Sequence, residues 1–448
     1  MRLQLIDVAA QPRVRTSFRT LSLSRLAGCT PAGVDISITD GRVEPIQLDP
    51  RADLYGLTFG CNMAPLAYQI ADHLREQGKT VVAGGTHTTA MPQEALQHFD
   101  AVLTGEAEGG AWARLLAEFE AGKLGGVYSN PSTPSVAGLA PPRLDLLPHK
   151  GLYLDFTPIE ATRGCTHSCS FCFNSTIHGE GFRTRPVEEV VEDVRRADSR
   201  NLMFMDDNLT GNKKYAKQLF EALIPLKKRL FFQTHLLMAE DPELMDLARR
   251  AGAQFVFVGI ESFEEGSLKA VKKQWNKVDR YRRYMDTFHA HQIFVSAGLI
   301  LGLDCDGPDI FDKTLRYLEE VRVDNAAVNL LIPYPGTAFH ADMQAQGRIL
   351  TDDYSRYTGF DVVVNPLKMT PQELAAGYDR VLREFFAPQR YLRSIVRHNM
   401  LSRAHIYGMA WWREPRRRTF ASLGRELNRR GGEGAAAPTW TPKLAQAG

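Results

Sequence analysis

Three of the six cysteines of this chain, Cys165, Cys169 and Cys172, lie within eight positions in the stretch ATRGCTHSCSFCFNS. Soft thiolates bind zinc or iron–sulfur clusters, and a closed structural zinc site needs four ligands. His167 and His178 lie nearby, but neither completes a second paired zinc knuckle. A cubane cluster held by three thiolates keeps one iron open for a further ligand, so the spacing favours a catalytic iron–sulfur cluster over the alternative, a zinc-stabilised binding module.

Length and charge narrow the class of protein. The chain has 448 residues, enough for two or three domains. Lys plus Arg number 54 against 52 Asp plus Glu, and this balance gives no field that would attract nucleic acid or an anionic membrane. The opening MRLQLIDVAAQPRVR lacks the apolar core of a signal peptide, and no later stretch reaches membrane-spanning length. We therefore expect a cytoplasmic protein without integral membrane association, in which thiols stay reduced.

Apolar runs and helical patterns alternate along most of the chain, which predicts an α/β fold with parallel sheets. A first series, from LQLIDVA to AWARLLAEFEAG, predicts an N-terminal doubly wound Rossmann-like domain over residues 1–130. The Pro-rich stretch NPSTPSVAGLAPPRLDLLP follows, and the pattern marks a boundary between residues 125 and 148.

A second series, from YLDFTPIEATRGC to AAVNLLIPYPGT, contains at most six strand-plus-helix units over residues 148–345. Six units fall short of the eight that close a barrel, so we expect an open, partial (β/α)6 barrel with the cysteine loop directly after its first strand. Beyond it, the pattern predicts a C-terminal, mostly helical domain over residues 346–415 and a basic, flexible tail over residues 416–448.

The cysteine spacing resembles the signature of the radical S-adenosylmethionine (SAM) enzymes, Cys-x3-Cys-x2-Cys with an aromatic residue, here Phe171, before the last cysteine. FMDDNLTG, VFVGIESFEEGSLKAVKKQWN, AGLILGLDCDGPDIFDKT, LIPYPGTAFHADMQAQGRIL and VVAGGTHTTAMPQEALQHFDAVLTGEAE are similar to the subgroup with an N-terminal cobalamin-binding domain. The resemblance covers about residues 1 to 395. It implies a 4Fe–4S cluster on the three cysteines, SAM chelated at the open iron, and a 5′-deoxyadenosyl radical released by reductive cleavage.

The resemblance also implies contacts with SAM at the strand ends of the barrel. Asp206, Asp207 and Asn208, after the second strand, are expected to accept hydrogen bonds from the methionyl ammonium or ribose; the alternative is a solvated turn. Glu261 closes the fourth strand with Ser262 beside it. A carboxylate that ends an apolar parallel strand is costly to desolvate without a partner, and ribose hydroxyls or an ammonium would supply one.

Further candidates follow other strands. Pro335 and Gly336 belong to PYPGT, a stiff turn whose glycine would let backbone approach a flat ring. The alternative is an ordinary turn, for which the same residue types are typical. Arg183 and Arg185 would clamp the SAM carboxylate or else face solvent. Cys305 ends the fifth barrel strand, where a thiol would donate a hydrogen atom to a substrate radical or serve as a structural residue.

In the first domain, ligands of an open sheet bind beyond the carboxyl ends of the strands. Gly84 and Gly85 remove side chains where backbone must approach a bulky group, and Thr86 and Thr88 offer hydroxyls to a phosphate or base. The Asp-x-His-x-x-Gly motif of many cobalamin domains is absent from the sequence, so bound cobalt is expected to have no histidine beneath it.

These features together predict a radical SAM enzyme that modifies an unactivated carbon of a small-molecule, lipid or natural-product substrate. Cobalamin-dependent C-methylation is the leading hypothesis. A cobalamin-free elimination, dehydration or rearrangement is the alternative. Reductive SAM cleavage needs an external electron, so an electron donor such as flavodoxin or ferredoxin is expected as a partner.

Overall fold

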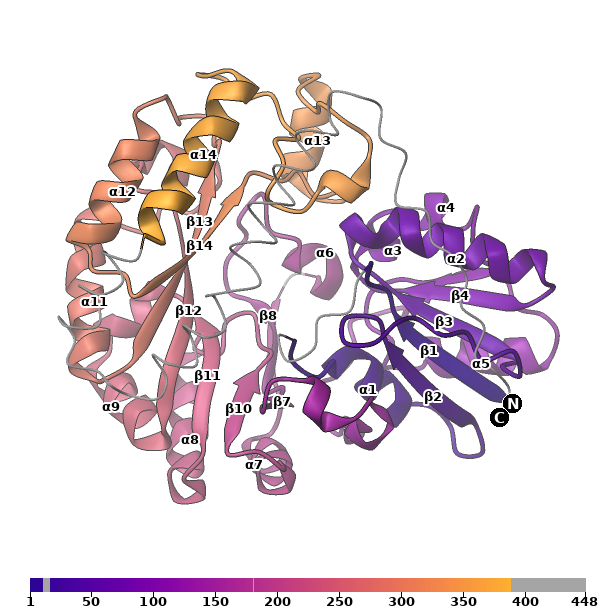
Figure 1. Ribbon diagram of the computed structural model, residues 1–448. Coiled ribbons are helices and arrows are strands. Elements are labelled where there is room, and N and C mark those ends of the chain that lie inside the picture. Colours follow the sequence, from indigo (N-terminus) through magenta and orange to yellow (C-terminus); the bar gives the residue numbers. More distant parts are fainter. Residues whose placement is uncertain (11–16, 180, 388–448) are drawn as a thin grey trace.

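The protein is described here by a computed structural model covering residues 1–10, 17–179 and 181–387 (Figure 1). It has two lobes, and each lobe is built on a six-stranded parallel sheet. Residues 388–415 of the predicted helical domain and the whole predicted tail, residues 416–448, lie outside the described residues.

The N-terminal lobe contains a parallel sheet in the order β2-β1-β3-β4-β5-β6. The order reverses direction at β1, as in doubly wound folds, so ligands are expected beyond the carboxyl ends of β1 and β3. Its strands are β1 (Arg2–Asp7), β2 (Asp35–Asp40), β3 (Leu54–Thr58), β4 (Thr80–Gly84), β5 (Ala101–Leu103) and β6 (Gly126–Tyr128).

Helices cover both faces of this sheet because strand side chains alternate between the faces. Ile6 and Leu57 pack toward α2, whereas Leu3, Leu5 and Leu54 pack toward α1 and α5. The expected doubly wound domain is thereby confirmed. The helices of this lobe are α1 (Leu21–Gly28), η1 (Cys61–Met63), α2 (Ala64–Glu76), α3 (Thr86–Ala90), α4 (Pro92–Ala95) and α5 (Ala111–Glu120).

The second lobe is the expected open, partial barrel. Its six parallel strands run in the order β14-β13-β12-β11-β10-β7, with β14 and β7 at the edges. The strands are β7 (Thr157–Ile159), β10 (Asn201–Phe204), β11 (Arg229–Thr234), β12 (Ala253–Glu261), β13 (Phe294–Leu301) and β14 (Asn325–Leu330).

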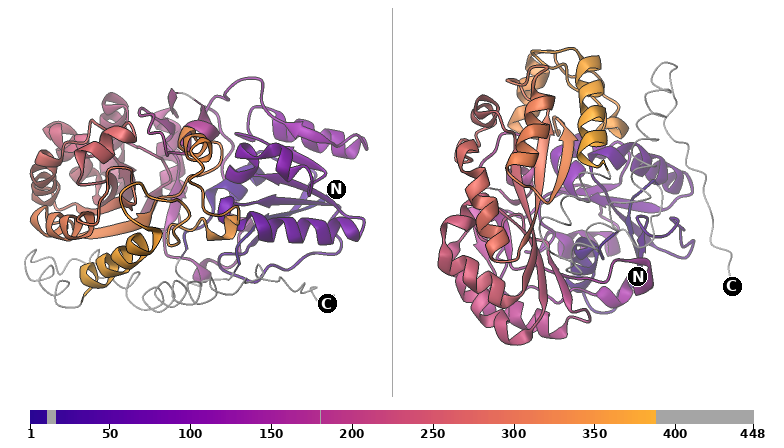
Figure 2. Two further views of the ribbon diagram at one scale, coloured as in Figure 1. Left: turned by 90° about the horizontal axis from the view of Figure 1, so that it is seen from above. Right: turned by 60° about the vertical axis from the view of Figure 1, so that its left-hand side comes forward.

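Helices cover the outer face of the barrel sheet and share one continuous apolar core with it (Figures 1 and 2). Short 3-10 turns join the linker and the barrel units: η2 (Leu144–Leu146), η3 (Lys150–Leu152), η4 (Ile224–Leu226), η5 (Leu236–Glu240) and η6 (Val278–Arg280). The α-helices of the barrel units are α7 (Val187–Arg196), α8 (Lys213–Leu223), α9 (Pro242–Ala251), α10 (Glu265–Ala270), α11 (Tyr281–Ala290) and α12 (Ile310–Glu320).

The first barrel strand differs from the expectation. YLDFTPIEATRGC does not form one strand: β7 ends at Ile159, and a separate strand, β8 (Thr162–Cys165), pairs in antiparallel fashion with β9 (Gly181–Thr184). The cysteine loop and α6 (Asn174–His178) lie between β8 and β9. The thiols are therefore presented by a small hairpin rather than directly by the barrel sheet.

After β14 the chain returns to the seam between the lobes. Helix α13 (Ala338–Ala345) and η7 (Tyr354–Arg356) precede α14 (Pro371–Phe385), a capped helix whose Thr370 and Glu373 form a reciprocal capping box. The apolar cluster at the seam joins Cys61 of the N-terminal lobe to Leu303, Phe339 and Val364.

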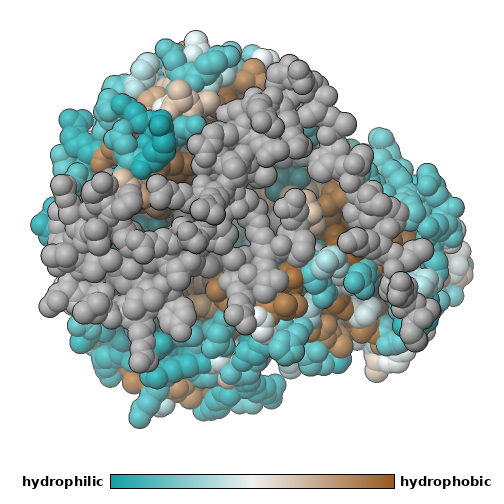
Figure 3. Space-filling model, in the orientation of Figure 1, coloured by the Kyte–Doolittle hydropathy of each residue, from teal (hydrophilic) through white to brown (hydrophobic). Residues whose placement is uncertain are grey.

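The outer rims of both lobes are mostly hydrophilic (Figure 3). Within the described residues, we find no helix with the length and apolar character that a membrane span requires.

Candidate functional site

A cavity of about 710 Å³ lies at the seam between the lobes. Its N-terminal wall comes from the carboxyl ends of strands, and it includes Asp7, Thr58 and Leu103, the last residues of β1, β3 and β5. Its opposite wall comes from the barrel lobe and includes His178 on α6 and Met205 after β10. The volume lies within the range of small-molecule and cofactor sites.

Three of the four predicted residues of the N-terminal lobe line this cavity: Gly84, Gly85 and Thr86. A methyl group on Gly84 would meet nothing closer than the Leu103 carbonyl at 3.8 Å, so the missing side chain at Gly84 leaves room beside the cavity. The region fits a bulky ligand in this respect. The predicted role of these residues in binding one stays a prediction.

Position 85 requires glycine because of its backbone conformation and its contacts within the protein. Its φ is +107°, and a Cβ there would lie 2.7 Å from Thr58 Oγ1. Thr88 is fully buried, and its hydroxyl donates to the Gly85 carbonyl over 3.1 Å. The contacts of Gly85 and Thr88 therefore hold the turn after β4.

The thiol loop is fixed from two sides. The Ser170 amide donates to the Val271 carbonyl at 3.2 Å, and the Ser170 carbonyl accepts from the Phe339 amide at 3.2 Å. A turn within the loop brings the Cys172 amide to the Cys169 carbonyl at 3.1 Å. Segments after α10 and β14 thus position a loop that begins on β8.

The three cysteines are half-buried and lie within electrostatic reach of one another. Burial raises the pKa of the Cys169 thiol to about 12, whereas metal ligation requires the thiolate. Among the described residues, no three His, Cys, Asp or Glu side chains form a recognisable metal-binding group. Three soft donors on one loop do fit an iron–sulfur cluster chemically, and their assignment as ligands stays a prediction.

The three predicted residues after β10 have different contacts in the structure. Asn208 is buried, and its Nδ2 lies 3.8 Å from the Cys165 sulfur, so it belongs to the thiol site. Asp206 is buried too, but its carboxylate accepts from the Ala161 amide at 3.1 Å and the Thr162 hydroxyl at 2.7 Å. Asp206 therefore anchors the start of β8, and its contact with SAM remains a prediction.

Asp207 is the exposed member of this trio. One of its carboxylate oxygens lies 3.8 Å from His178 Nε2. The Asn174 side chain is a further hydrogen-bond partner of the Asp207 carboxylate, and the contact of Asp207 with SAM stays a prediction.

Glu261 has a partner that the sequence did not predict. Its carboxylate lies 2.7 Å from the Lys273 ammonium, and both side chains are nearly buried. Burial alone would lower the pKa of Lys273, but Glu261 and the thiols of Cys169 and Cys172 raise it above its usual value. Lys273 thus brings a positive charge next to the thiols.

The backbone of Glu261 is unusual. Its φ is +65°, a left-handed conformation that is uncommon for a residue with a side chain, and the pairing of β12 with β13 shifts register there. This bulge places a carboxylate at the mouth of the barrel. Ser262 is buried beside it, and its hydroxyl accepts from the Glu264 amide at 3.0 Å.

Several buried polar atoms near the thiol loop have no partner in the described structure. His167 stacks on Trp275 with ring centres 4.0 Å apart, and His235 meets His167 edge-on. The unpartnered atoms belong to five residues: His167 Nε2, Ser170 Oγ, Asn208 Oδ1, His235 Nδ1 and Trp275 Nε1. Buried polar atoms are normally paired, so this group fits a polar ligand at the barrel mouth.

Pro335 and Gly336 form the expected turn after β14. Gly336 has φ +83°, and a Cβ there would lie 2.9 Å from Ala90 of the N-terminal lobe. Its carbonyl accepts from the Thr176 hydroxyl at 3.1 Å. The close approach that Gly336 permits is therefore to α3 and α6, and an approach to a flat ring stays a prediction for Pro335 and Gly336.

Cys305 was expected to end the fifth barrel strand, but β13 ends at Leu301 and Cys305 lies in the loop that follows, where it is half-buried. Its sulfur faces α10, where a methyl group on Gly266 would lie 3.1 Å from it. The role of Cys305 as a hydrogen-atom donor stays a prediction.

Arg183 and Arg185 point neither to a free anion site nor to solvent. Arg183 pairs with Glu106 of the N-terminal lobe, and Arg185 is buried against Asp193 at 2.8 Å. Both expected alternatives, a SAM clamp and a solvated face, are replaced by these ion pairs. The partner of Arg183 lies 77 positions away in the sequence, so local patterning had no means of finding it.

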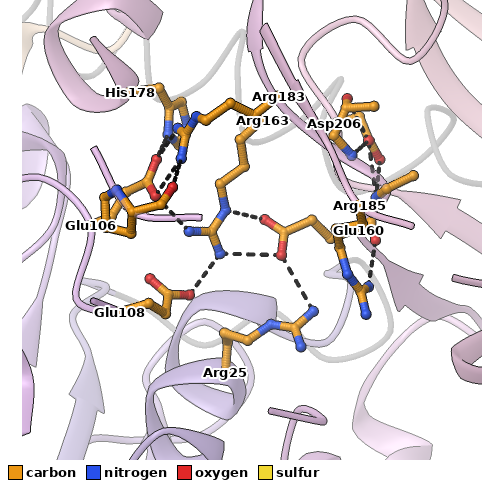
Figure 4. A network of polar contacts seen from close by, with 12 residues as sticks. Arg25, Glu106, Glu108, Glu160, Arg163, His178, Arg183, Arg185 and Asp206 are labelled. Atoms are coloured by element: carbon orange, nitrogen blue, oxygen red, sulfur yellow. Dashed lines mark hydrogen bonds and ion pairs between the residues drawn. The ribbon is translucent and has the colours of Figure 1, made fainter. Parts of the chain in front are cut away.

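Arg183 belongs to a network that crosses the seam (Figure 4). Figure 4 shows the Arg163 guanidinium between three carboxylates, those of Glu106, Glu108 and Glu160. We call the whole network the interdomain charge cluster; its members are Arg25, Glu106, Glu108, Glu160, Arg163, His178 and Arg183.

Lys273, Trp275 and His235 were not predicted as site residues. Lys273 and Trp275 lie inside the quoted motif VFVGIESFEEGSLKAVKKQWN, but the motif gives no sign of which side chains turn inward. His235 directly follows β11, and its position after a parallel strand was the available signal.

Residues 159–318 match the family model described as the Radical SAM superfamily. The chain is 29% identical over 395 residues to the bacteriochlorophyllide d C-12(1)-methyltransferase of Chlorobaculum tepidum. That match covers 84% of this chain and 86% of the relative.

Two solved structures share the fold. TsrM from Kitasatospora setae, a radical SAM methyltransferase with cobalamin and a [4Fe-4S] cluster bound, gives a TM-score of 0.62 at 15% identity over 87% of this chain and 86% of that chain. The cobalamin-dependent SAM radical enzyme OxsB, with aqua-cobalamin and SAM bound, gives 0.64 at 15% identity over 96% and 75%. At this identity the likeness concerns the fold, including the arrangement of an N-terminal lobe against a partial barrel.

Proposed function

Because the chain belongs to the radical SAM superfamily, we propose that it is a cobalamin-dependent radical SAM C-methyltransferase. In this proposal it transfers a methyl group derived from SAM to an unactivated carbon of a small-molecule substrate. The cofactors are a 4Fe–4S cluster, SAM and cobalamin.

One observation carries the proposal: the cavity at the seam opens between the strand ends of the N-terminal sheet and the hairpin that bears the thiols. Open α/β sheets bind ligands at such strand ends, and barrels carry their chemistry at the same end of the strands. A cofactor in the cavity would therefore adjoin the barrel mouth. The names of the relative and of the two solved structures support methyl transfer and cobalamin.

The residues present fit distinct roles in this reaction. Cys165, Cys169 and Cys172 would hold the cluster. When bound, the cluster supplies the electron that cleaves the SAM sulfonium and releases a carbon radical. Glu261 and Lys273 form a buried pair beside the thiols and would orient the polar groups of SAM.

The name of one relative supports the proposed substrate class. The C. tepidum relative is named for a bacteriochlorophyllide, a tetrapyrrole. We propose a small molecule of comparable kind, a tetrapyrrole, lipid or secondary metabolite, as the methyl acceptor. A cytoplasmic setting and a low-potential donor such as flavodoxin or ferredoxin complete the proposal, because reductive cleavage needs an electron that this chain does not generate.

Anaerobic purification and reconstitution test the proposal. The purified protein should be brown, with iron and sulfide in a ratio near one, and should take up hydroxocobalamin. With SAM, dithionite and a small-molecule extract, turnover should yield both S-adenosylhomocysteine and 5′-deoxyadenosine, and methyl-labelled SAM should label a product. A protein that takes up no cobalamin and yields 5′-deoxyadenosine alone would carry out the cobalamin-free elimination, dehydration or rearrangement instead.

A further inference from the structure

The hairpin that carries the thiols belongs to neither large sheet. Among the described residues, β8 and β9 pair as a separate two-stranded sheet. An isolated hairpin is marginally stable, so its placement depends on contacts outside its own ladder. One anchor is Asp206 of the barrel lobe, which accepts from the Ala161 and Thr162 amides at the start of β8. The other anchor comes from the N-terminal lobe.

That second anchor is Glu106, in the loop between β5 and α5. Its Oε2 accepts from Arg163 at 2.9 Å and from Arg183 at 3.0 Å. Its Oε1 accepts from Arg183 as well and lies 2.8 Å from His178 Nδ1. One carboxylate thus binds β8, β9 and α6, which are all three elements that flank the thiol loop.

The hairpin needs this carboxylate for an electrostatic reason. Arg163 and Arg183 lie directly opposite each other in the β8–β9 register. Like charges at opposite positions destabilise a strand pair. Glu106 lies between the two guanidiniums and offsets their repulsion, and it comes from the other lobe. Glu160 of the barrel lobe also pairs with Arg163, but the charge shared by Arg163 and Arg183 is compensated only when the N-terminal lobe is docked.

Burial makes this contact a fixed one. The side chain of Glu106 is 4% exposed and that of Arg163 is 8% exposed. Three carboxylates, Glu106, Glu108 and Glu160, face the three guanidiniums of Arg25, Arg163 and Arg183. Such a balanced buried network contributes little net stability but specifies one geometry, because any displacement leaves a buried charge unpaired.

The network also adjoins the cavity. Glu106, Glu108, Glu160, Arg163 and His178 all line it. Most of the charges that fix the hairpin therefore also form part of the cavity wall.

We propose that Glu106 is a positioning residue that clamps the β8–β9 hairpin, and with it the thiol loop, against the cavity of the N-terminal lobe. Its consequence for catalysis rests on the proposed function: methyl transfer requires groups bound in the cavity and at the thiol loop to meet at a fixed separation. Misplacement by ~1 Å can reduce a reaction by ~10²-fold. Glu106 acts through Arg163, Arg183 and His178 rather than on the substrate.

Hydrogen exchange in the cofactor-free protein tests the clamp directly. Glu106→Gln keeps the shape but removes the charge, so amides of β8 and β9 should exchange about tenfold faster while those of β12 and β13 stay unchanged. Arg183→Lys keeps the charge but loses the bidentate fork, and should give a smaller increase at the same amides. Glu120→Gln, an exposed carboxylate on α5 of the same lobe, is the matched control.

The pattern of exchange decides the outcome. Unchanged exchange in β8 and β9 would overturn the clamp, and faster exchange throughout the barrel would assign Glu106 a general role in stability instead. A double variant, Glu106→Gln with Arg183→Gln, should be no faster than Glu106→Gln alone if the two residues act as one unit. Additive effects of the two substitutions on the exchange rates would show that Glu106 and Arg183 act independently.

The loaded enzyme supplies a second readout. In Glu106→Gln the ratio of S-adenosylhomocysteine to 5′-deoxyadenosine should fall about tenfold, because radical formation and methyl transfer lose their alignment. A ratio equal to that of Glu120→Gln would refute the catalytic consequence. If the wild-type protein yields no S-adenosylhomocysteine, the proposed function fails, whereas the exchange experiment still tests the clamp by itself.

Discussion

The two sides of the thiol loop handle buried polarity in opposite ways. Toward the N-terminal lobe, charged groups are paired within the chain: both oxygens of Glu106 accept from cationic or ring donors. Toward the barrel mouth, polar atoms of His167, His235 and Trp275 are buried without a partner. A buried polar atom without a hydrogen bond costs ~1–3 kcal/mol, so the two sides cannot have the same purpose.

The difference separates structure from binding. At the centre of the interdomain charge cluster both oxygens of Glu106 are engaged, although Arg25 Nε at its edge is buried without a partner, and this centre holds the hairpin in place. An unsatisfied group of donors and acceptors beside three half-buried thiols fits a site that binds a polar ligand. The same comparison divides the trio after β10, since Asp206 is fully engaged by backbone whereas Asn208 keeps its Oδ1 free beside Cys165.

The largest effect is expected at the thiols themselves. Cys165→Ala, Cys169→Ala or Cys172→Ala should abolish iron incorporation or leave an incomplete cluster that does not respond to SAM, because a methyl group cannot replace thiolate ligation. Iron analysis and 5′-deoxyadenosine formation after reconstitution measure this loss. Cys305→Ala is the control and should keep its iron. Wild-type SAM cleavage in all three variants would exclude the cluster assignment.

The next effect concerns the pair beside the thiols. Glu261→Gln leaves the Lys273 ammonium buried without its counter-charge, so the free energy of unfolding should fall by ~3–5 kcal/mol and SAM affinity by about tenfold. Adding Lys273→Met should restore most of the stability, because no unpaired charge remains. SAM affinity, measured by titration of the reconstituted protein, should stay low in the double variant. Full recovery of affinity would make the pair purely structural.

More of the fold than of the site could be predicted from the sequence. Alternation of apolar runs with helical periodicity predicted both parallel sheets, since each sheet is covered on its faces by the helices that follow its strands. The hairpin β8–β9 escaped prediction because the pattern of YLDFTPIEATRGC predicts one strand, whereas the chain leaves the sheet after Ile159 and Asp206 binds the Ala161 and Thr162 amides. Short strands whose pairing depends on distant charges carry no periodic signal.

Within the site, residue type predicted which side chains need a partner, but it did not predict which residue that partner is. Glu261 was expected to need a partner because a carboxylate ending an apolar strand is costly to bury, and the structure supplies Lys273. Arg183 was expected either to clamp the SAM carboxylate or to face solvent, and it pairs instead with Glu106 of the other lobe. Local sequence reports which charges need compensation, and only the packing of the lobes decides which group provides it.

A smaller effect should appear in the pH dependence of the free energy of unfolding, through His235 at the barrel mouth. Burial lowers the pKa of His235 to about 4 from an ordinary value of 6.5. Between these values the unfolded chain binds a proton that the folded protein does not, so stability should fall as the pH drops from 6.5 to 4. His235→Phe should flatten this fall by ~3 kcal/mol, measured by denaturant unfolding at several pH values. A slope equal to that of the wild type would show that His235 is already accessible to protons.

The smallest change in stability should come from Gly84→Ala on the cavity side. The added methyl group meets no atom closer than 3.8 Å, so the free energy of unfolding should change by less than ~0.5 kcal/mol. The same substitution at Gly85 should cost ~1–3 kcal/mol, because φ is +107° and Thr58 Oγ1 would lie 2.7 Å away.

Gly84→Ala should nevertheless weaken hydroxocobalamin uptake several-fold, since the methyl group occupies space at the cavity wall. Equilibrium dialysis against hydroxocobalamin, with denaturant unfolding on the same samples, separates the two effects. Uptake that is unchanged in Gly84→Ala would place the corrin elsewhere, and the cavity would then be a seam between lobes rather than a cofactor site.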